Sequence, residues 1–206
     1  MVFEGIAQPV ESDILRPLPT DGDISQYVLM NYKQPFEYVK EGGDKGFHKK
    51  GEWAKAAYWI VQNSNLTAGE GGAAVDLAFK TKYGDGSDAG LALQTDWGFD
   101  NPKNDGKVYQ TSHLQKGKYK LTAHVYEYDG RGFIGYVAVC KGNEMANTSD
   151  IPSKSLANAS ISGTGDVVVD ILVEEPTDVV IGFVCTITVK QGRAKIDNFK
   201  LELVEQ

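Results

Sequence analysis

The sequence has few of the side chains on which most enzyme sites are built. It contains three histidines, His48, His113 and His124, and none of them has zinc-ligand spacing or lies near a Gly-x-Ser-x-Gly motif. Its two cysteines, Cys140 and Cys185, lie in apolar strand patterns rather than in the polar, basic setting that lowers a thiol pKa. A zinc site, a hydrolytic triad and thiol catalysis are therefore unsupported. The cysteines fit either a disulfide or, as we favour, two small core side chains.

Positive charge and long apolar runs are also scarce. The net charge is −7 and the densest basic cluster is Lys49-Lys50, which argues against nucleic acid as a partner. No stretch approaches the roughly 18 to 20 apolar residues that span a bilayer. The N-terminus lacks the basic-then-apolar layout of a signal peptide, and we interpret Met1 as a start placed after a removed leader. A hydrophobic fraction of 41% is typical of a folded domain.

Strand patterns dominate the rest of the chain. Residues 1–26 hold three prolines and little periodicity, which predicts a linker or N-terminal arm, and residues 27–206 are expected to form one domain. Apolar residues alternate in short segments separated by Gly, Asn and Asp, which predicts an all-β, antiparallel two-sheet β-sandwich. The expected strands are 56–62, 73–79, 89–95, 107–114, 118–128, 133–141, 155–162, 166–173, 178–189 and 194–204. In the fifth of these, Leu121, Ala123 and Val125 should face inward.

Several motifs resemble a known family. They are residues 104–111 (NDGKVYQT), 116–121 (KGKYKL), 135–142 (GYVAVCKG), 180–184 (VIGFV) and 195–201 (KIDNFKL). Together they are similar to the galactose-binding-like jelly rolls of uncharacterised surface proteins of gut Bacteroidetes, over about residues 30–206. The resemblance implies a jelly roll like that of carbohydrate-binding modules. It also implies export to the cell surface, as part of a lipoprotein, and a role in glycan capture beside other domains of the same protein.

One end of the sandwich carries the candidate binding site. If successive strands are antiparallel, loops 63–72, 96–106, 129–132, 163–165 and 190–192 share one end, and loops 80–88, 115–117, 142–154 and 174–177 share the other. The first end is rich in aromatic and polar side chains, and the expected ligand-binding residues are Trp97, Phe99, Asn104, Tyr128, Asp129 and Arg131. Trp97 would stack on a sugar ring while Arg131 and Asn104 donate and accept hydrogen bonds. Alternatively, Trp97 closes the core and the polar residues are solvated turns.

A second aromatic group and a metal site are weaker candidates. Trp53, Tyr58 and Trp59 cluster near the first strand, but alternation puts Tyr58 and Trp59 on opposite faces, so one of them belongs to the core. The resemblance implies that Asp197 could hold a structural calcium, and no other cofactor is expected. Acidic residues of the loop 80–88 lie at the other end by the same count and could not share that ion.

The sequence favours binding over catalysis. Our first hypothesis is a non-catalytic carbohydrate-binding domain of a secreted or cell-surface protein. The second is a spacer domain of a surface lipoprotein without a ligand of its own. The third is a glycoside hydrolase that uses a pair from Asp96, Asp100 and Asp129, since such enzymes need two carboxyl groups across a cleft.

Overall fold

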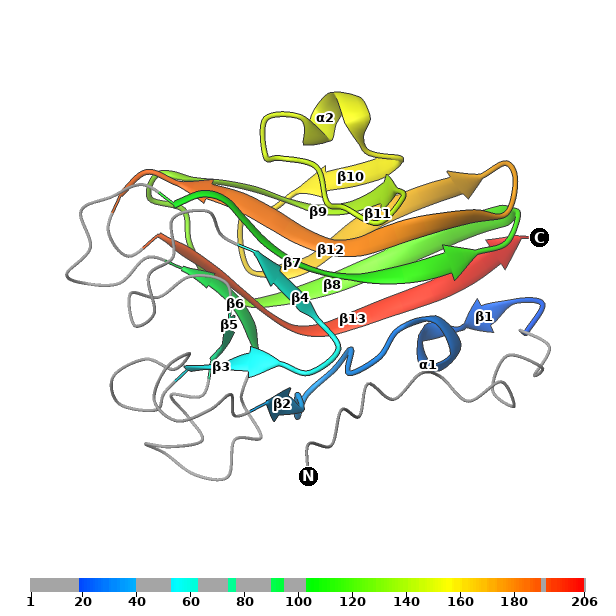
Figure 1. Cartoon of the computed structure of the whole chain (residues 1–206), viewed down its shortest axis with the longest axis horizontal. Helices are drawn as coiled ribbons and strands as arrows, with labels where there is room; N and C mark the ends of the chain where they lie inside the picture. Colours follow the sequence, from blue (N-terminus) through cyan, green and yellow to red (C-terminus); the bar gives the residue numbers. More distant parts are fainter. Residues whose placement is uncertain are drawn as a thin grey trace, which may run out of the picture.

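Two antiparallel sheets pack face to face to form the molecule. The computed structural model describes residues 19–39, 53–62, 74–76, 90–94, 103–189 and 192–205. Figure 1 shows the two layers, with the long strands of each running side by side. The fold is an all-β jelly-roll sandwich, as the sequence predicts. Within the described ranges, no helix has the length and apolar character needed to cross a bilayer.

The larger sheet has eight strands in the order β11-β8-β13-β6-β5-β3-β2, with β1 pairing beside β13. These are β1 (Gly22–Asp23), β2 (Tyr38–Val39), β3 (Trp53–Ala56), β5 (Ala74–Asp76), β6 (Leu91–Gln94), β8 (Gly117–Asp129), β11 (Gly165–Val173) and β13 (Arg193–Glu205). The smaller sheet has the order β10-β9-β12-β7-β4. Its strands are β4 (Ile60–Gln62), β7 (Lys103–Leu114), β9 (Phe133–Lys141), β10 (Ala157–Ser160) and β12 (Thr177–Ile187). Two short helices, α1 (Ser25–Val28) and α2 (Ile151–Lys154), complete the described elements.

Alternation along the strands builds the core between the sheets. In β8, Leu121, Ala123 and Val125 are fully buried, while the residues between them are only partly buried. This confirms the inward face predicted from the sequence. Phe183 of β12 and Phe199 of β13 meet across the interior with ring centroids 6.3 Å apart. The buried apolar side chains of both sheets stabilise the fold, since burial of apolar area drives folding.

The expected strand 56–62 is instead divided between the two sheets. β3 ends at Ala56 in the larger sheet and β4 begins at Ile60 in the smaller one, so the chain crosses the sandwich between them. A turn at Ala57 and Tyr58 makes the crossing, and Tyr58 has a φ of 66°. Residues 56–61 are apolar or aromatic without interruption, so nothing in the local sequence marks this turn.

Part of the segment assigned to the arm contacts the sandwich. Gly22 and Asp23 pair with Leu203 and Glu202 of β13, and Ile24 is fully buried in the core. Of residues 1–26, only 19–26 are described. The boundary between arm and domain at residue 26 stays a prediction. The strand β1, which pairs with the sandwich, lies before this boundary.

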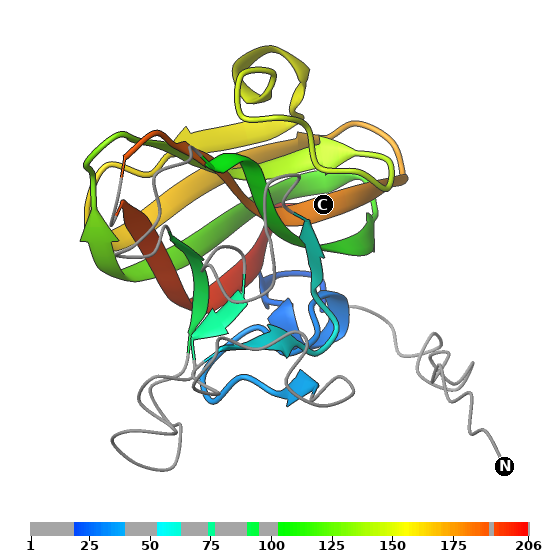
Figure 2. The same ribbon diagram turned by 60° about the vertical axis from the view of Figure 1, so that its left-hand side comes forward.

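A loop with a short helix covers the outer face of the smaller sheet. Residues 142–156, which include α2, bury Met145 and Ile151 against Tyr109, Val180 and other residues of that face. Figure 2 shows α2 above this sheet, on the opposite side of the sandwich from the N-terminal elements. This second apolar cluster gives the smaller sheet two buried faces.

The cysteines are free and occupy different layers. Cys185 faces the core between the sheets, whereas Cys140 lies under the covering loop. Burial raises the pKa of both thiols. The structure thus supports the interpretation of two small core side chains and excludes the disulfide.

Candidate functional site

The strand register defines the end of the sandwich that holds the candidate site. Lys103 at the start of β7 is opposite Ile187 at the end of β12, and Ile187 is opposite Phe133 at the start of β9. The turn 130–132 therefore lies at the same end as Asn104. Of the six expected ligand-binding residues, Asn104, Tyr128, Asp129 and Arg131 are brought to this end, whereas Trp97 and Phe99 lie outside the described residues.

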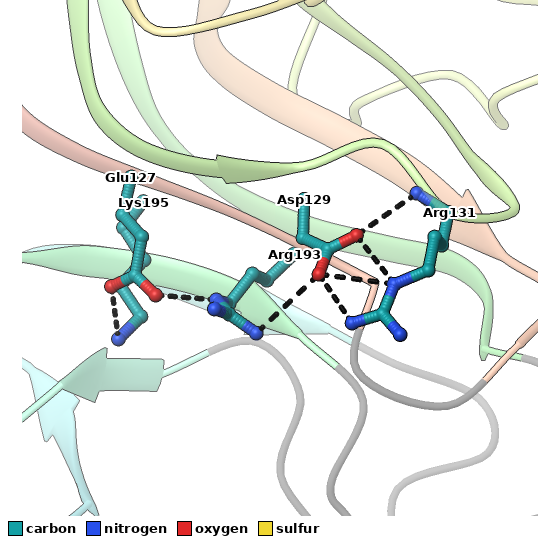
Figure 3. A network of polar contacts seen from close by, with 5 residues as sticks. All are labelled: Glu127, Asp129, Arg131, Arg193 and Lys195. Atoms are coloured by element: carbon teal, nitrogen blue, oxygen red, sulfur yellow. Dashed lines mark hydrogen bonds and ion pairs between the residues drawn. The ribbon is translucent and has the colours of Figure 1, made fainter.

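A row of five charged side chains lies at this end on the outer face of the larger sheet. Arg193 is the cross-strand neighbour of Asp129, and Lys195 is the neighbour of Glu127. Because paired residues project to the same side of a sheet, their opposite charges meet. Figure 3 shows the side chains in sequence along the two strands, from Lys195 and Glu127 through Arg193 to Asp129 and Arg131. Three cations thus alternate with two carboxylates.

The distances indicate a connected network. Lys195 Nζ lies 2.8 Å from Glu127 Oε2, and Arg193 Nε donates to the other oxygen of Glu127. Arg193 Nη1 also lies 3.9 Å from Asp129 Oδ2. The Lys195 side chain is only 9% exposed, which is unusual for a lysine on an outer face. Glu127 therefore provides a counter-charge at a position where a lone cation would be costly.

Asp129 and Arg131 form a two-pronged pair within one turn. Arg131 Nε donates to Asp129 Oδ1 at 2.9 Å, and its Nη2 donates to Oδ2 at 2.5 Å. The Arg131 backbone N–H also donates to Oδ1, at 3.2 Å. Such fork-shaped pairs fix the plane of both groups. The Arg131 side chain is 59% exposed, so the turn presents a planar guanidinium to solvent in a defined orientation.

These contacts keep both carboxyl groups ionised. The hydrogen bond from the Arg131 side chain lowers the pKa of Asp129 to about 2, against a smaller opposing effect of burial. Burial alone would raise the pKa of Glu127, but Lys195 and Arg193 outweigh it and hold this pKa below its usual value. Neither group can carry a proton near neutral pH, so both act only as hydrogen-bond acceptors.

We expect the stability provided by Asp129 to disappear in acid. Its folded-state pKa lies below the ordinary value, so its contribution is present above about pH 4 and is lost as the pH falls through about 2. A carboxyl carbon NMR titration should show a midpoint for Asp129 near 2. In Arg131→Gln that midpoint should rise towards the ordinary aspartate value, because the main cause of the shift is removed. A wild-type midpoint near 4 would contradict the pairing.

The Tyr128 ring packs against the core, whereas the expected role in sugar binding calls for an exposed ring. Its ring meets Phe133 edge to face, with centroids 5.5 Å apart and planes at 83°. It also lies over Gly130, where an added Cβ would come within 2.7 Å of the Tyr128 hydroxyl oxygen. The half-buried ring therefore closes this end of the core. A direct contact between Tyr128 and a sugar stays a prediction.

The start of β7 contains a bulge at Asn104 and Asp105. Register shifts here, since Cys185 is opposite Gly106 but Ile187 is opposite Lys103. Asp105 has a φ of 54°, a conformation that non-glycine residues rarely adopt. Its Oδ1 accepts the Thr148 backbone N–H at 2.7 Å. Loop 142–156 leaves the other end of the sandwich, as predicted, but lies along the sheet and reaches Asp105 at this end.

Asp197 lies apart from the charged row. It occupies an irregularity of β13, four residues or about 13 Å along the strand from Arg193. Its Oδ1 lies 2.7 Å from His124 Nδ1 of the neighbouring strand. Within the described residues, no three His, Cys, Asp or Glu side chains converge as a metal site would require. A calcium ion at Asp197 stays a prediction without a described set of partner ligands.

Sequence reasoning missed Glu127, Arg193 and Lys195. The period-two spacing of Glu127 with Asp129, and of Arg193 with Lys195, is visible in the sequence. An acidic pair in one strand and a basic pair in another could have suggested that the two strands are neighbours. Their register joins strands 66 residues apart, however, and no local signal fixes it.

Several solved structures are similar to this chain at low sequence identity. TmCBM61, solved in complex with β-1,4-galactotriose, is 14% identical with a TM-score of 0.42, over 79% of this chain and 97% of that chain. The adhesin domain of Epf from Streptococcus pyogenes is 12% identical with a TM-score of 0.48, over 90% of this chain and 64% of that chain. The CBM22-1 xylan-binding domain of Paenibacillus barcinonensis Xyn10C is 9% identical with a TM-score of 0.36, over 84% and 98%. These similarities concern the fold.

No curated protein matches the sequence. Residues 30–182 match the family described as a domain of unknown function, DUF5013.

Proposed function

Because the chain belongs to the DUF5013 family of domains of unknown function, we propose its role from the geometry: non-catalytic carbohydrate binding at the end of the sandwich that holds the turn 130–132. The observation that carries the proposal is the oriented pair of Asp129 and Arg131 on that turn. A sugar hydroxyl both donates and accepts, so a neighbouring carboxylate and guanidinium held in one plane match it.

Polar side chains that are already held in place strengthen binding, because less conformational entropy is lost when the ligand binds. Ordering a flexible arginine on binding costs free energy, and Arg131 has already lost much of that freedom to Asp129. Asn104, near the start of β7, lies at the same end, and we propose it as a further contact of the site. Trp97 and Phe99 would supply the apolar face on which a pyranose ring stacks.

The pKa values of the row remove one candidate for the general acid of the hydrolase alternative. A glycosidase needs one carboxyl group whose pKa is raised enough to donate a proton to the leaving group. The pKa values of Asp129 and Glu127 are both lowered. Asp129 is therefore unsuited to be the general acid, and we propose that it only accepts hydrogen bonds.

We propose that the domain works at the cell surface, in the exported and lipid-anchored protein that the family resemblance implies. There it would hold a polysaccharide near other domains of the same chain. A spacer domain without a ligand is the competing role, and the binding experiment below separates the two.

Binding to soluble galactan, xylan and mannan tests the proposal. Affinity gel electrophoresis should show retention of the wild type by at least one of them. Arg131→Ala and Trp97→Ala should each weaken that retention by about tenfold or more, the equivalent of one or two lost contacts. Arg131→Ala should remain folded, and its loss of stability should be limited to the contact with Asp129 that acid also removes.

A matched control is available at the other end of the sandwich. His113 and Asp178 also form an exposed pair, with Nδ1 and Oδ1 2.7 Å apart. His113→Ala should leave retention unchanged. Equal losses in His113→Ala and Arg131→Ala would contradict a site at the turn 130–132. A wild type that no polysaccharide retains would favour the spacer, and release of reducing sugar would favour the hydrolase.

A further inference from the structure

The crossing between β3 and β4 holds an exposed aromatic side chain on a strained backbone. Tyr58 is 56% exposed and has a φ of 66°, in the left-handed region that L-residues with bulky side chains seldom enter. Trp59, the next residue, is buried, which confirms the expectation that the two face opposite ways. The strained conformation therefore turns one ring into the core and the other into solvent.

Asn31 makes three side-chain hydrogen bonds, one to this turn and two to Glu37. Its Nδ2 donates to the carbonyl oxygens of Glu37 and Ala57, both at 2.9 Å, and its Oδ1 accepts the Glu37 N–H at 2.7 Å. Asn31 itself has a φ of 48°. The Ala57 N–H donates to the Glu37 carbonyl at 3.0 Å, so the segments 31–37 and 57–59 are joined directly.

The buried ring beside Tyr58 anchors the same turn to the core. Trp59 Nε1 donates to the Asn31 carbonyl at 2.9 Å, and its ring lies against Phe199 with centroids 5.1 Å apart. These contacts hold the backbone of the turn and the Trp59 ring in place, while the Tyr58 ring is exposed to solvent.

Strain that surrounding contacts maintain is a feature of functional positions. A glycine would occupy the left-handed conformation without strain, yet the chain has a tyrosine there. We propose that Tyr58 is the stacking platform of a second carbohydrate-binding site, which takes the apolar C–H face of a pyranose ring. The ligand class rests on the proposed function, whereas the position of the site does not.

The second site is well separated from the first. β4 is the edge strand of the smaller sheet at one side, and β9, which follows the turn 130–132, lies beyond β7 and β12 from it. Ile60 pairs with Tyr109 in the middle of β7, far from Lys103 at its start. One long polysaccharide could contact both sites, and two weak contacts on one chain bind more tightly than either alone.

Four variants at two tyrosines test the proposal, with the galactan, xylan and mannan gels as probes. Tyr58→Ala and Tyr58→Gly should weaken retention by about tenfold, the loss of one aromatic contact, and Tyr58→Phe should retain it. Tyr58→Gly should also raise the melting temperature, because glycine relieves the strain. Tyr27→Ala is the matched control, since Tyr27 is an exposed tyrosine of α1 with ordinary backbone geometry, and it should bind as the wild type does.

The combination of higher stability and weaker binding in Tyr58→Gly is the decisive result. A more stable Tyr58→Gly with unchanged retention would overturn the second site, while a loss in Arg131→Ala would still support the first. Loss in the Tyr58 variants with normal retention of Arg131→Ala and Trp97→Ala would support the second site and overturn the first. A wild type that none of the three polysaccharides retains would overturn both.

Discussion

Gly182→Ala is expected to destabilise the domain by about 3 kcal/mol or more, the cost of forcing atoms into a packed interior that cannot relax. Gly182 lies in β12, which pairs with β7 on one side and β9 on the other. An added Cβ would come within 2.6 Å of Tyr109 Cα and 2.7 Å of Tyr109 Cβ, and closer still to the Val108 carbonyl oxygen. Because these are largely backbone atoms of a paired strand, relief requires separation of β7 from β12.

Urea unfolding followed by circular dichroism measures this loss. Gly163→Ala is the control, because Gly163 has ordinary φ and no atom within 4 Å of its added Cβ. We expect that variant to unfold within about 0.5 kcal/mol of the wild type. Similar stabilities for the two alanine variants would show that β7 and β12 are not packed as described.

Phe199→Ala is expected to cost about 4 kcal/mol, as for other large-to-small changes at fully buried aromatic positions. Phe199 has no exposed surface and contacts both Trp59 and Phe183. Its removal leaves a cavity between the sheets at the point where the β3–β4 crossing is anchored. The Trp59 fluorescence should therefore shift as well as the unfolding midpoint.

Val204→Ala, on the same strand, separates burial from a general effect of substitution in β13. Val204 is 56% exposed, and we expect a change within about 0.5 kcal/mol. Chemical denaturation of both variants provides the comparison. A loss for Phe199→Ala below about 1 kcal/mol would indicate that the ring is not part of the core.

Much of the sandwich could be predicted from local patterns. The expected strand 133–141 coincides with β9, and 166–173 differs from β11 by one residue, because alternation and flanking glycines mark their limits. The loop count placed Asn104 and Arg131 at the same end, as the register of Lys103, Ile187 and Phe133 shows. Antiparallel alternation is enough for this level of detail.

Long-range register could not be predicted in the same way. The contact of Glu127 with Arg193 depends on irregular pairing between β8 and β13, in which shifts occur around Ile196. Similarly, the crossing at Tyr58 depends on a left-handed turn that Asn31 supports from another part of the chain. Neither the ion pair nor the crossing is indicated by the residues of its own segment. The ion pair of Asp129 with Arg131 is local, but sequence alone did not show that these two expected ligand contacts bind each other.

The loop 142–156 also limits the shape of ligand that the domain can hold. Met145 and Ile151 seal the middle of one broad face, and Lys107 Nζ fastens the loop through the Met145 carbonyl at 2.8 Å. On the opposite face, the described parts of β8 and β13 expose mainly alternating charges. The described surfaces thus lack the long flat aromatic strip on which a crystalline fibre would rest. A carbohydrate bound at the proposed sites would therefore approach the end of the sandwich or the β3–β4 crossing rather than the face that this loop covers.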